Sequence, residues 1–434
     1  MAVGAERGRA VMPGRWYALA VIPDELRREF LALYGRPSSV AVRAPGRVNL
    51  IGEHTDYSDL PVLPMAIGQA LMVAASARDD GVVRVASSQF EPPAELHRGQ
   101  RDEEIFAPWH RYVAGVLAQV TEMAPGQGAD LFVAGDLPSS GGLSSSSALT
   151  VGVLAALAEV WGEQLAPANL VSRAIVAERH VGVESGGMDQ TVIVFAQAGN
   201  ALRIDFKPPG QRQAPIPEGL AFVVASSGEE APKGGGVRDA YNERVVGARI
   251  AAAMIADEVG VDLEFPPTLG QVSDVDVVDI LVDGLPERIT PQEVAHGARV
   301  DVARLVQLTS STFDHMAKVP VKRIARHILG EAERVGLAES ALLAGDLKRF
   351  GALLNESHNS LREDFRCSTA ALDRVCAAMR KAGAFGARLT GAGFGGFALA
   401  ACSPGDVEAV VAAAITATGG PAFEVCASDG LRVL

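Results

Sequence analysis

A loop rich in glycine and serine passes directly into a long apolar run in the stretch Pro138-Ser139-Ser140-Gly141-Gly142-Leu143-Ser144-Ser145-Ser146-Ser147-Ala148. A loop that opens a helix is an anion site, because unpaired backbone N–H groups converge there and the helix dipole adds partial positive charge. The glycines let a phosphate approach the backbone, and the serine hydroxyls can reach a phosphate or Mg²⁺. The stretch therefore predicts a triphosphate site. The alternative is a serine N-cap on a buried helix, for which one serine suffices.

The charge balance limits what such a site can bind. The chain has 39 Lys and Arg against 52 Asp and Glu, which gives a net charge of −13. An acidic protein has no long-range attraction for nucleic acid, so we expect no nucleic-acid partner. A phosphate site must then be built locally from backbone dipoles, a few cations and a metal ion. With 434 residues and 48% hydrophobic content, the chain can bury a large core and form two or three domains.

The cysteines and the apolar runs indicate the compartment. All four cysteines lie in the last fifth of the chain without a C-x-x-C pair, which argues against a disulfide scaffold or a structural zinc. The first residues, Met1 to Arg7, lack the apolar core of a signal peptide. The longest apolar run, Ala148 to Val160, contains Glu159 and is too short to span a bilayer. We expect a cytoplasmic protein without membrane contact.

Strand-like and helix-like segments alternate along the whole chain. The expected strands are 39–43 and 48–51 around a break at Pro45-Gly46, then 131–134, 201–206, 220–225, 387–390 and 397–401. The expected helices are 145–161, 167–180, 237–259, 323–343, 347–363 and 407–417. Prolines and glycines gather between 207 and 217, and they predict a boundary between an N-terminal lobe, 1–208, and a C-terminal lobe, 209–434. This mixture predicts an α+β protein with two α/β lobes and a small-molecule site in the cleft between them.

A second polar segment follows the first expected strand, in Arg43-Ala-Pro-Gly-Arg-Val-Asn-Leu-Ile-Gly-Glu-His-Thr-Asp-Tyr57. Its arginine, carboxylates and imidazole are expensive to bury without partners, so a polar ligand is a natural explanation. Carboxylates and imidazole orient the O–H groups of a sugar well. The alternative is a solvated turn in which Arg47 pairs with Glu53 or Asp56.

A third segment places Gly186 and Gly187 just before Met188 and Asp189. Two glycines let the backbone approach a ligand and aim the carboxylate, so Asp189 is a candidate base or substrate clamp. The alternative is a plain N-cap of the following helix.

The fourth segment is Arg388-Leu-Thr-Gly-Ala-Gly-Phe-Gly-Gly396. It matches G-x-G-x-x-G, but a strand follows the glycines where a dinucleotide-binding motif needs a helix, so an NAD-linked oxidoreductase is disfavoured. A loop against a substrate or phosphate, or a simple tight turn, explains the segment better. The G-x-x-x-x-G-K-[ST] motif of P-loop NTPases is absent from the chain.

In this order, the segments resemble the GHMP superfamily of small-molecule kinases and, within it, the galactokinase family. Gly46 to Tyr57 is similar to the galactokinase signature, Gly142 to Ser146 to the ATP-phosphate loop, and Thr390 to Gly396 to the third motif. The resemblance spans roughly 40–401 and implies the two-lobed GHMP-kinase fold.

The resemblance also implies a role for each matched residue. Asp189 would act as the base toward the anomeric hydroxyl of the sugar, and Arg47 would stabilise negative charge on that oxygen and on the phosphoryl group. The sugar would be held by Glu53, His54, Asp56, Gly186 and Tyr241. ATP would be bound by Trp109, Gly141, Gly142, Leu143, Ser144, Ser145 and Ser146. Mg²⁺ would be held by Ser145, Ser146 and Glu178.

The implied reaction is ATP- and Mg²⁺-dependent phosphorylation of galactose at the anomeric hydroxyl, in a protein expected to be monomeric. Two departures from the family pattern leave the sugar open: Ser58 to Pro61 after the signature, and the loop from Ser226 to Lys233. Gly186 to Gln190 is also similar to N-acetylgalactosamine kinases, and arabinose or galacturonate are further alternatives. A sensor that binds sugar and ATP without transfer is a different class, although its expected damage to the serine loop or to Asp189 is not seen.

Overall fold

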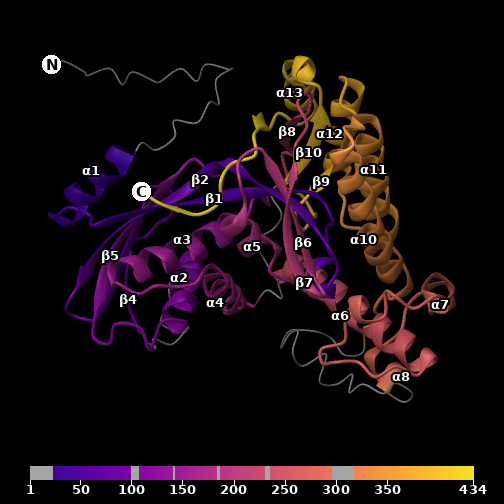
Figure 1. Ribbon diagram of the computed structural model, residues 1–434, viewed down its shortest axis with the longest axis horizontal. Coiled ribbons are helices and arrows are strands. Elements are labelled where there is room, and N and C mark those ends of the chain that lie inside the picture. Colours follow the sequence, from indigo (N-terminus) through magenta and orange to yellow (C-terminus); the bar gives the residue numbers. More distant parts are fainter. Residues whose placement is uncertain (1–22, 99–106, 140–141, 183–185, 230–234, 296–316) are drawn as a thin grey trace, which may run out of the picture.

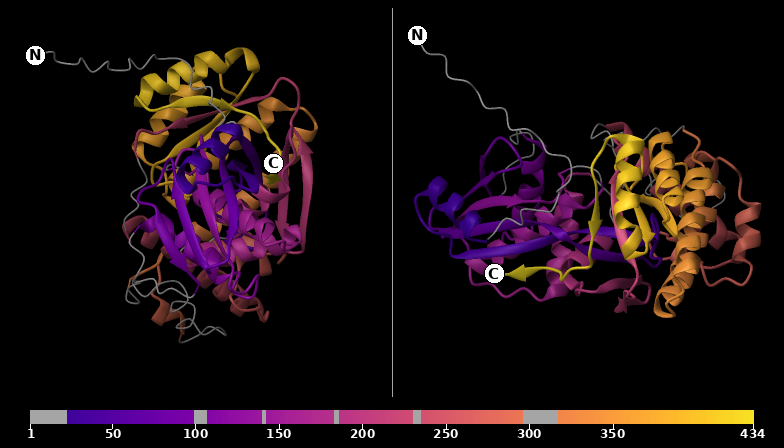
Figure 2. Two further views of the ribbon diagram at one scale, coloured as in Figure 1. Left: turned by 90° about the vertical axis from the view of Figure 1, so that its left-hand side faces the viewer. Right: turned by 90° about the horizontal axis from the view of Figure 1, so that it is seen from above.

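The computed structural model describes residues 23–98, 107–139, 142–182, 186–229, 235–295 and 317–434. The six-stranded sheet lies toward one end of the long axis and the four-stranded sheet nearer the middle, with helices of the second half of the chain toward the other end (Figures 1 and 2). The elements of the first half are α1 (Pro23–Tyr34), β1 (Val40–Ile51), η1 (Asp56–Ser58), β2 (Leu63–Arg78), β3 (Val82–Ser87), β4 (Ala94–His97), α2 (Pro108–Ala118), β5 (Gly128–Gly135), α3 (Ser145–Val160), α4 (Pro167–Arg179), α5 (Met188–Phe195), β6 (Asn200–Phe206) and β7 (Pro209–Pro215).

The second half begins with β8 (Ala221–Ser226) and the long helix α6 (Gly235–Val259). It continues with η3 (Leu269–Gln271), α7 (Val278–Gly284), α8 (Pro291–Ala295), α10 (Lys322–Leu343), α11 (Leu347–Ser360), the π-helical turn η4 (Leu361–Phe365), α12 (Ala370–Lys381), β9 (Gly386–Thr390), β10 (Phe397–Cys402), η5 (Pro404–Asp406), α13 (Val407–Thr418), β11 (Ala422–Val425) and β12 (Arg432–Val433).

The first sheet has the strand order β12-β1-β2-β5-β3-β4 and buries both of its faces. Side chains alternate along a strand, so Val42 and Ala44 of β1 face the main core, where α3 packs, while Ala41 faces the other side. On that other side, Leu26 and Phe30 of α1 cover the sheet. The serine loop therefore enters a helix that lies directly against β1 and β2.

The second sheet has the order β11-β8-β10-β9 and lies between helices. Helices α12 and α13 pack on one face, whereas α11 packs on the other through Phe350 and Leu353, which continue the main core. The short strand β12 then returns the chain to the first sheet, pairing Val433 with Val42. The two halves are thus joined through shared core and a shared strand.

The structure confirms most of the expected elements and corrects two. Segments 39–43 and 48–51 are one strand, β1, because the expected break at Pro45-Gly46 is only a register shift against β2. Gly46 leaves room there for the side chain of Leu137, whose Cδ1 would lie too close to a Cβ at this position. The residues expected to mark a lobe boundary form β7, which pairs with β6 in a two-stranded sheet that tolerates terminal prolines. The division at 208/209 therefore falls between the strands of one hairpin and stays a prediction.

A membrane-spanning helix was not expected from the sequence. In the ranges that the structure describes, every helix is too short or too polar to cross a bilayer.

Candidate active site

Arg47 and Asp189 form the centre of the site. Arg47 follows the register shift in β1, and Asp189 lies in the first turn of α5, which Gly187 opens with a φ of 106°. The Nε of Arg47 donates to Oδ1 of Asp189 at 2.7 Å, and its Nη2 donates to Oδ2 at 2.8 Å. Burial disfavours the charged guanidinium, yet Asp189 raises the pKa of Arg47 above its ordinary value. The pair excludes the solvated-turn interpretation, because Arg47 is only 5% exposed.

The serine loop lies against the same carboxylate. Ser144, at a φ of 62°, donates its Oγ hydrogen to Oδ2 of Asp189 at 2.5 Å. Ser147 donates to Oε2 of Glu178 at 2.8 Å and lies 3.5 Å from Asp189. The loop and the candidate base therefore face one another.

The structure refines which serines accompany Glu178. Ser146 and Ser147 both hydrogen-bond to Glu178, whereas the Oγ of Ser145 donates to the carbonyl of Ser139 at 3.2 Å. Ser145 thus has a different partner from the one its expected metal role suggests. The sequence interpretation missed Ser147 and also Gln190, whose side-chain amide donates to Glu178.

Two further carboxylates, Asp56 and Glu178, lie close enough to Asp189 to feel its charge. Burial, reinforced by the negative charge of Asp189, raises the pKa of Glu178 to about 6. The same two causes raise the pKa of Asp56 to about 6. Asp56, Glu178 and Asp189 together outweigh the positive charge of Arg47, so the site is suited to a cation.

The described residues hold no cluster of three or more His, Cys, Asp or Glu side chains that could bind a metal by itself. Mg²⁺ is commonly held by one or two carboxylates and the phosphates of its nucleotide. Glu178 with the adjoining hydroxyls of Ser146 and Ser147 fits that donor set.

The expected sugar-binding residues lie beside the central pair. A Cβ on Gly186 would lie 2.5 Å from Cγ of Asp56, so only glycine fits against that turn. His54 stacks on Phe365 with ring centroids 4.2 Å apart, and the ring of Tyr241 lies 5.7 Å away. Burial drives the pKa of His54 well below its usual value, so the ring is neutral and can both donate and accept.

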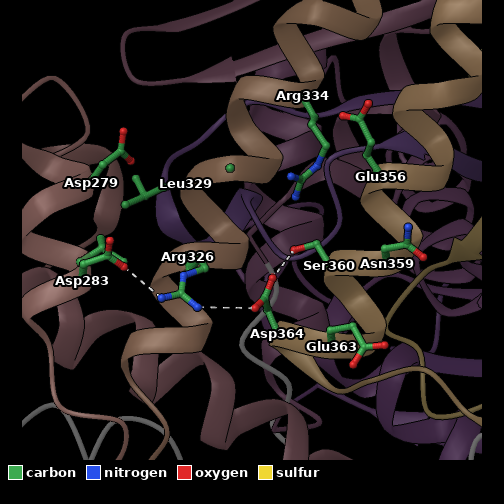
Figure 3. Close-up of a pocket in the computed structure, with 12 residues that line it drawn as sticks. Asp279, Asp283, Arg326, Leu329, Arg334, Glu356, Asn359, Ser360, Glu363 and Asp364 are labelled. Carbon is green, nitrogen blue, oxygen red and sulfur yellow. Dashed lines mark hydrogen bonds and ion pairs between the residues drawn. The ribbon is translucent and has the colours of Figure 1, made fainter.

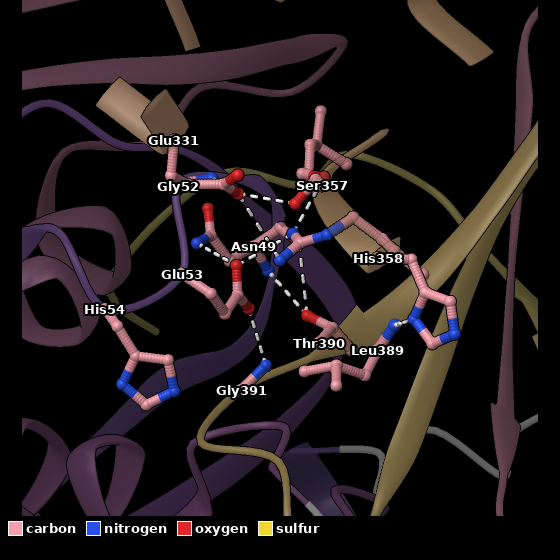
Figure 4. A network of polar contacts seen from close by, with 12 residues as sticks. Asn49, Gly52, Glu53, His54, Glu331, Ser357, His358, Leu389, Thr390 and Gly391 are labelled. Carbon is pink, nitrogen blue, oxygen red and sulfur yellow. Dashed lines mark hydrogen bonds and ion pairs between the residues drawn. The ribbon is translucent and has the colours of Figure 1, made fainter. Parts of the chain in front are cut away.

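Glu53 differs from the other expected sugar ligands because protein groups already occupy most of its carboxylate. It is 2% exposed and accepts hydrogen bonds from Asn49 Nδ2 at 2.5 Å and from the N–H of Gly391 at 2.6 Å (Figure 4). Arg388 Nη1 lies 2.7 Å from its Oε2. A carboxylate has about four acceptor positions, so little capacity is left for a sugar. Its contact with sugar stays a prediction.

The expected nucleotide-binding residues are partly described. Trp109 lies in the first turn of α2 and stacks on Phe90 with centroids 5.8 Å apart, and its Nε1–H has no hydrogen-bond partner among the described residues. Gly142 lies against Gly391, and Leu143 is buried in the core. Gly141 lies outside the described residues.

A cavity of about 630 Å³ lies apart from these residues, between α7, α10, α11 and η4 (Figure 3). Three of its charged lining residues pair with one another: Arg326 reaches Asp283 at 2.9 Å and Asp364 at 3.9 Å. Ser360 in its wall lies 2.9 Å from Nδ1 of His327. The cavity is separate from the Arg47–Asp189 pair.

Comparison with known proteins agrees with this arrangement. A model of the galactokinase galactose-binding signature matches residues 28–77, and models of the GHMP kinase N-terminal and C-terminal domains match residues 111–197 and 338–419. The crystal structure of Lactococcus lactis galactokinase complexed with galactose superposes with a TM-score of 0.75 at 27% identity, covering 94% of this chain and 99% of that one. A mevalonate kinase from Methanococcus jannaschii, at 16% identity and a TM-score of 0.57, shares the fold.

The fold and the site therefore define a small-molecule kinase of the GHMP class. Curated galactokinases resemble the chain along most of its length. That of Chloroflexus aggregans is 36% identical over 395 residues, covering 89% of this chain and 90% of the relative. That of a Roseiflexus species is 36% identical over 429 residues, covering 94% and 96%. The chain belongs to the galactokinase family.

Proposed function

We propose that this protein transfers the γ-phosphoryl group of ATP to the anomeric hydroxyl of galactose, giving galactose 1-phosphate and ADP. The observation that carries the proposal is the contact of three distant segments at one carboxylate: Arg47 and Ser144 both hydrogen-bond to Asp189. Family membership supplies the reaction class, and this contact supplies a location for it.

Asp189 would accept the proton of the sugar hydroxyl as the oxygen attacks the phosphorus. A positioned base contributes roughly 10²–10⁴-fold to the rate. A carboxylate is a weak base for a sugar hydroxyl, so Arg47 would lower the cost of the alkoxide-like oxygen. Phosphoryl transfer depends on alignment and charge neutralisation, and the rigid pair of β1 and α5 supports both.

The sugar would lie among His54, Asp56, Gly186 and Tyr241, with Glu53 behind them. The neutral ring of His54 and the carboxylate of Asp56 are suited to hydroxyls, since together they can donate and accept. Aromatic neighbours around His54 give the sugar an apolar surface.

The serine loop would bind the phosphates of ATP, with the N-terminus of α3 behind it. The residues for this role are Gly141, Gly142, Leu143, Ser144, Ser145 and Ser146, with Trp109 on the adenine side. Ser146, Ser147 and Glu178 would hold Mg²⁺, and Ser145 retains its expected place near the phosphates. When bound, Mg²⁺ neutralises charge on the phosphates.

A cytoplasmic location and a monomeric state remain part of the proposal. All four cysteines are unpaired, which supports a reducing compartment.

A coupled ADP-release assay tests the function across galactose, N-acetylgalactosamine, arabinose and galacturonate. We expect the highest kcat/KM with galactose. A higher kcat/KM with another of these sugars would show that this sugar is the substrate. Binding of sugar and ATP without turnover would favour a sensor. No ADP release with any of the sugars would overturn the proposal.

A further inference from the structure

Arg388, at the start of the third glycine motif, is a fully buried charge that the proposed reaction does not use. It lies on β9 of the second sheet and is 0% exposed. Its Nη1 lies 2.7 Å from Glu53 and donates to the carbonyls of Asn49 and Leu50 at 3.2 and 3.0 Å. One guanidinium thus reaches from the third motif into the sugar signature.

The arginine is only partly satisfied by these contacts. Its Nε and Nη2 have no hydrogen-bond partner among the residues that the structure describes, although Nη2 lies 3.7 Å from Glu331. Burying a charge with incomplete partners is destabilising compared with an apolar residue of similar size. A gain for the site is the natural reason to keep an arginine here.

A continuous series of contacts connects Arg388 with the central pair. Glu53 accepts the N–H of Gly391, and Gly391 lies against Gly142, since a Cβ on Gly391 would be 3.1 Å from the Gly142 carbonyl. That carbonyl accepts a hydrogen bond from Nη1 of Arg47 at 2.5 Å. The sugar signature, the third motif and the phosphate loop are therefore connected by hydrogen bonds and by the close packing of Gly391 on Gly142.

We propose that Arg388 is a positioning residue, which anchors Glu53 and the Gly391 loop and so fixes the sugar signature at its distance from the phosphate loop. This inference rests on the proposed function. Arg388 acts through Glu53 and touches neither substrate.

The charge of Arg388 matters as well as its shape. Glu53 accepts most strongly from both Asn49 and Gly391 when it is ionised, because protonation makes one oxygen a donor and weakens it as an acceptor. Burial raises the pKa of Glu53, and Arg388 is the main group that opposes this. The groups facing Glu53 are Arg388, Arg47, Asn49, the Gly391 N–H, His327 and Cys367. Burial lowers the pKa of His327 to about 4, so that ring is neutral and cannot replace Arg388.

The test compares Arg388→Met with Arg203→Met in the purified full-length protein. Arg203 is a matched control: its side chain is 11% exposed and pairs with Asp205 at 2.7 Å and Glu339 at 3.3 Å, in the β6–β7 hairpin. The assay measures kcat and galactose KM from pH 5 to 9, with the melting temperature of each variant.

We expect Arg388→Met to lower kcat/KM roughly 10- to 100-fold at neutral pH, as a misplacement near 1 Å does. Its acid limb should move to higher pH, because Glu53 then needs a higher pH to ionise. Arg203→Met should lose stability and keep the wild-type profile. If Arg388→Met does not fold, Arg388→Lys should show a smaller upward shift of the acid limb and a smaller loss of kcat/KM, because lysine keeps the charge but not the geometry of the guanidinium.

A profile and a kcat/KM like those of Arg203→Met would overturn the inference. If the wild type does not phosphorylate galactose, the proposed function fails instead. Galactose affinity, measured by calorimetry, then tests the role of Arg388 without any need for turnover. Weaker galactose binding by the Arg388 variant, most marked at low pH, supports the inference. Unchanged binding overturns it.

Discussion

Arg47 holds both carboxylate oxygens of Asp189, at 2.7 and 2.8 Å, although the two residues are 142 positions apart in the chain. Such a bidentate pair fixes the orientation of the carboxylate as well as its charge. Four predictions follow from this geometry and its surroundings.

Asp189→Asn should keep the fold and the affinity for ATP while kcat falls by at least about 10². The amide can still accept from Ser144, but it cannot act as the base and leaves Arg47 without its counter-charge. The coupled ADP-release assay and a thermal melt separate these effects. A variant that unfolds would instead show that the pair with Arg47 is needed for stability.

Arg47→Lys should lower kcat more than it raises the galactose KM. A lysine keeps the charge but cannot make the two parallel hydrogen bonds or reach the Gly142 carbonyl at the same time. Steady-state kinetics in both substrates check this. The reverse pattern, with KM raised and kcat kept, would assign Arg47 to ground-state sugar binding.

The pH dependence of kcat/KM should reflect the ionisation of Asp56 and Glu178. The pKa values of Asp56 and Glu178 are raised to about 6, so kcat/KM should fall as the pH drops below about 6 and both groups become neutral. Because the folded state holds these protons more tightly than the unfolded state, the two groups make the protein less stable as the pH rises from about 4 to about 6. Asp56→Asn should remove its part of that slope in denaturant titrations, and an unchanged slope would contradict it.

Gly186→Ala should raise the galactose KM about 10-fold or more, because the new methyl group must displace the turn that carries Asp56. Gly68→Ala is the matched control, since a Cβ there meets nothing within 4 Å. Equal KM values for the two variants would show that the close approach at Gly186 is not needed for the sugar.

The sequence predicted best what is local. A few residues are enough to predict the structure of the serine loop, of the helix after it and of the glycines before Asp189. The resemblance to galactokinases then predicted that those segments lie at one site. Even so, the partner of each serine depends on the turn at Ser144. This turn has a φ of 62°, and no neighbouring residue indicates it. Ser147, which bonds to Glu178, was therefore missed and Ser145 was favoured.

Long-range partners could not be read from the sequence. Glu53 and Gly391 are 338 positions apart, and nothing near Glu53 indicates that the third motif occupies its carboxylate. In the same way, the sequence of α1 does not indicate which sheet face Leu26 and Phe30 cover. Pro45-Gly46 is typical of a strand end in sequence. In the structure β1 continues past it, because Pro45 and Arg47 both pair with residues of β2.

The most direct test of the central claim is the ³¹P NMR spectrum of a reaction containing the protein, ATP, Mg²⁺ and galactose. We expect ADP and a phosphomonoester coupled to the anomeric proton of the sugar, formed by the wild type and lost in Asp189→Asn. A phosphate on another hydroxyl, or the same product formed at an unchanged rate by the variant, would contradict that claim.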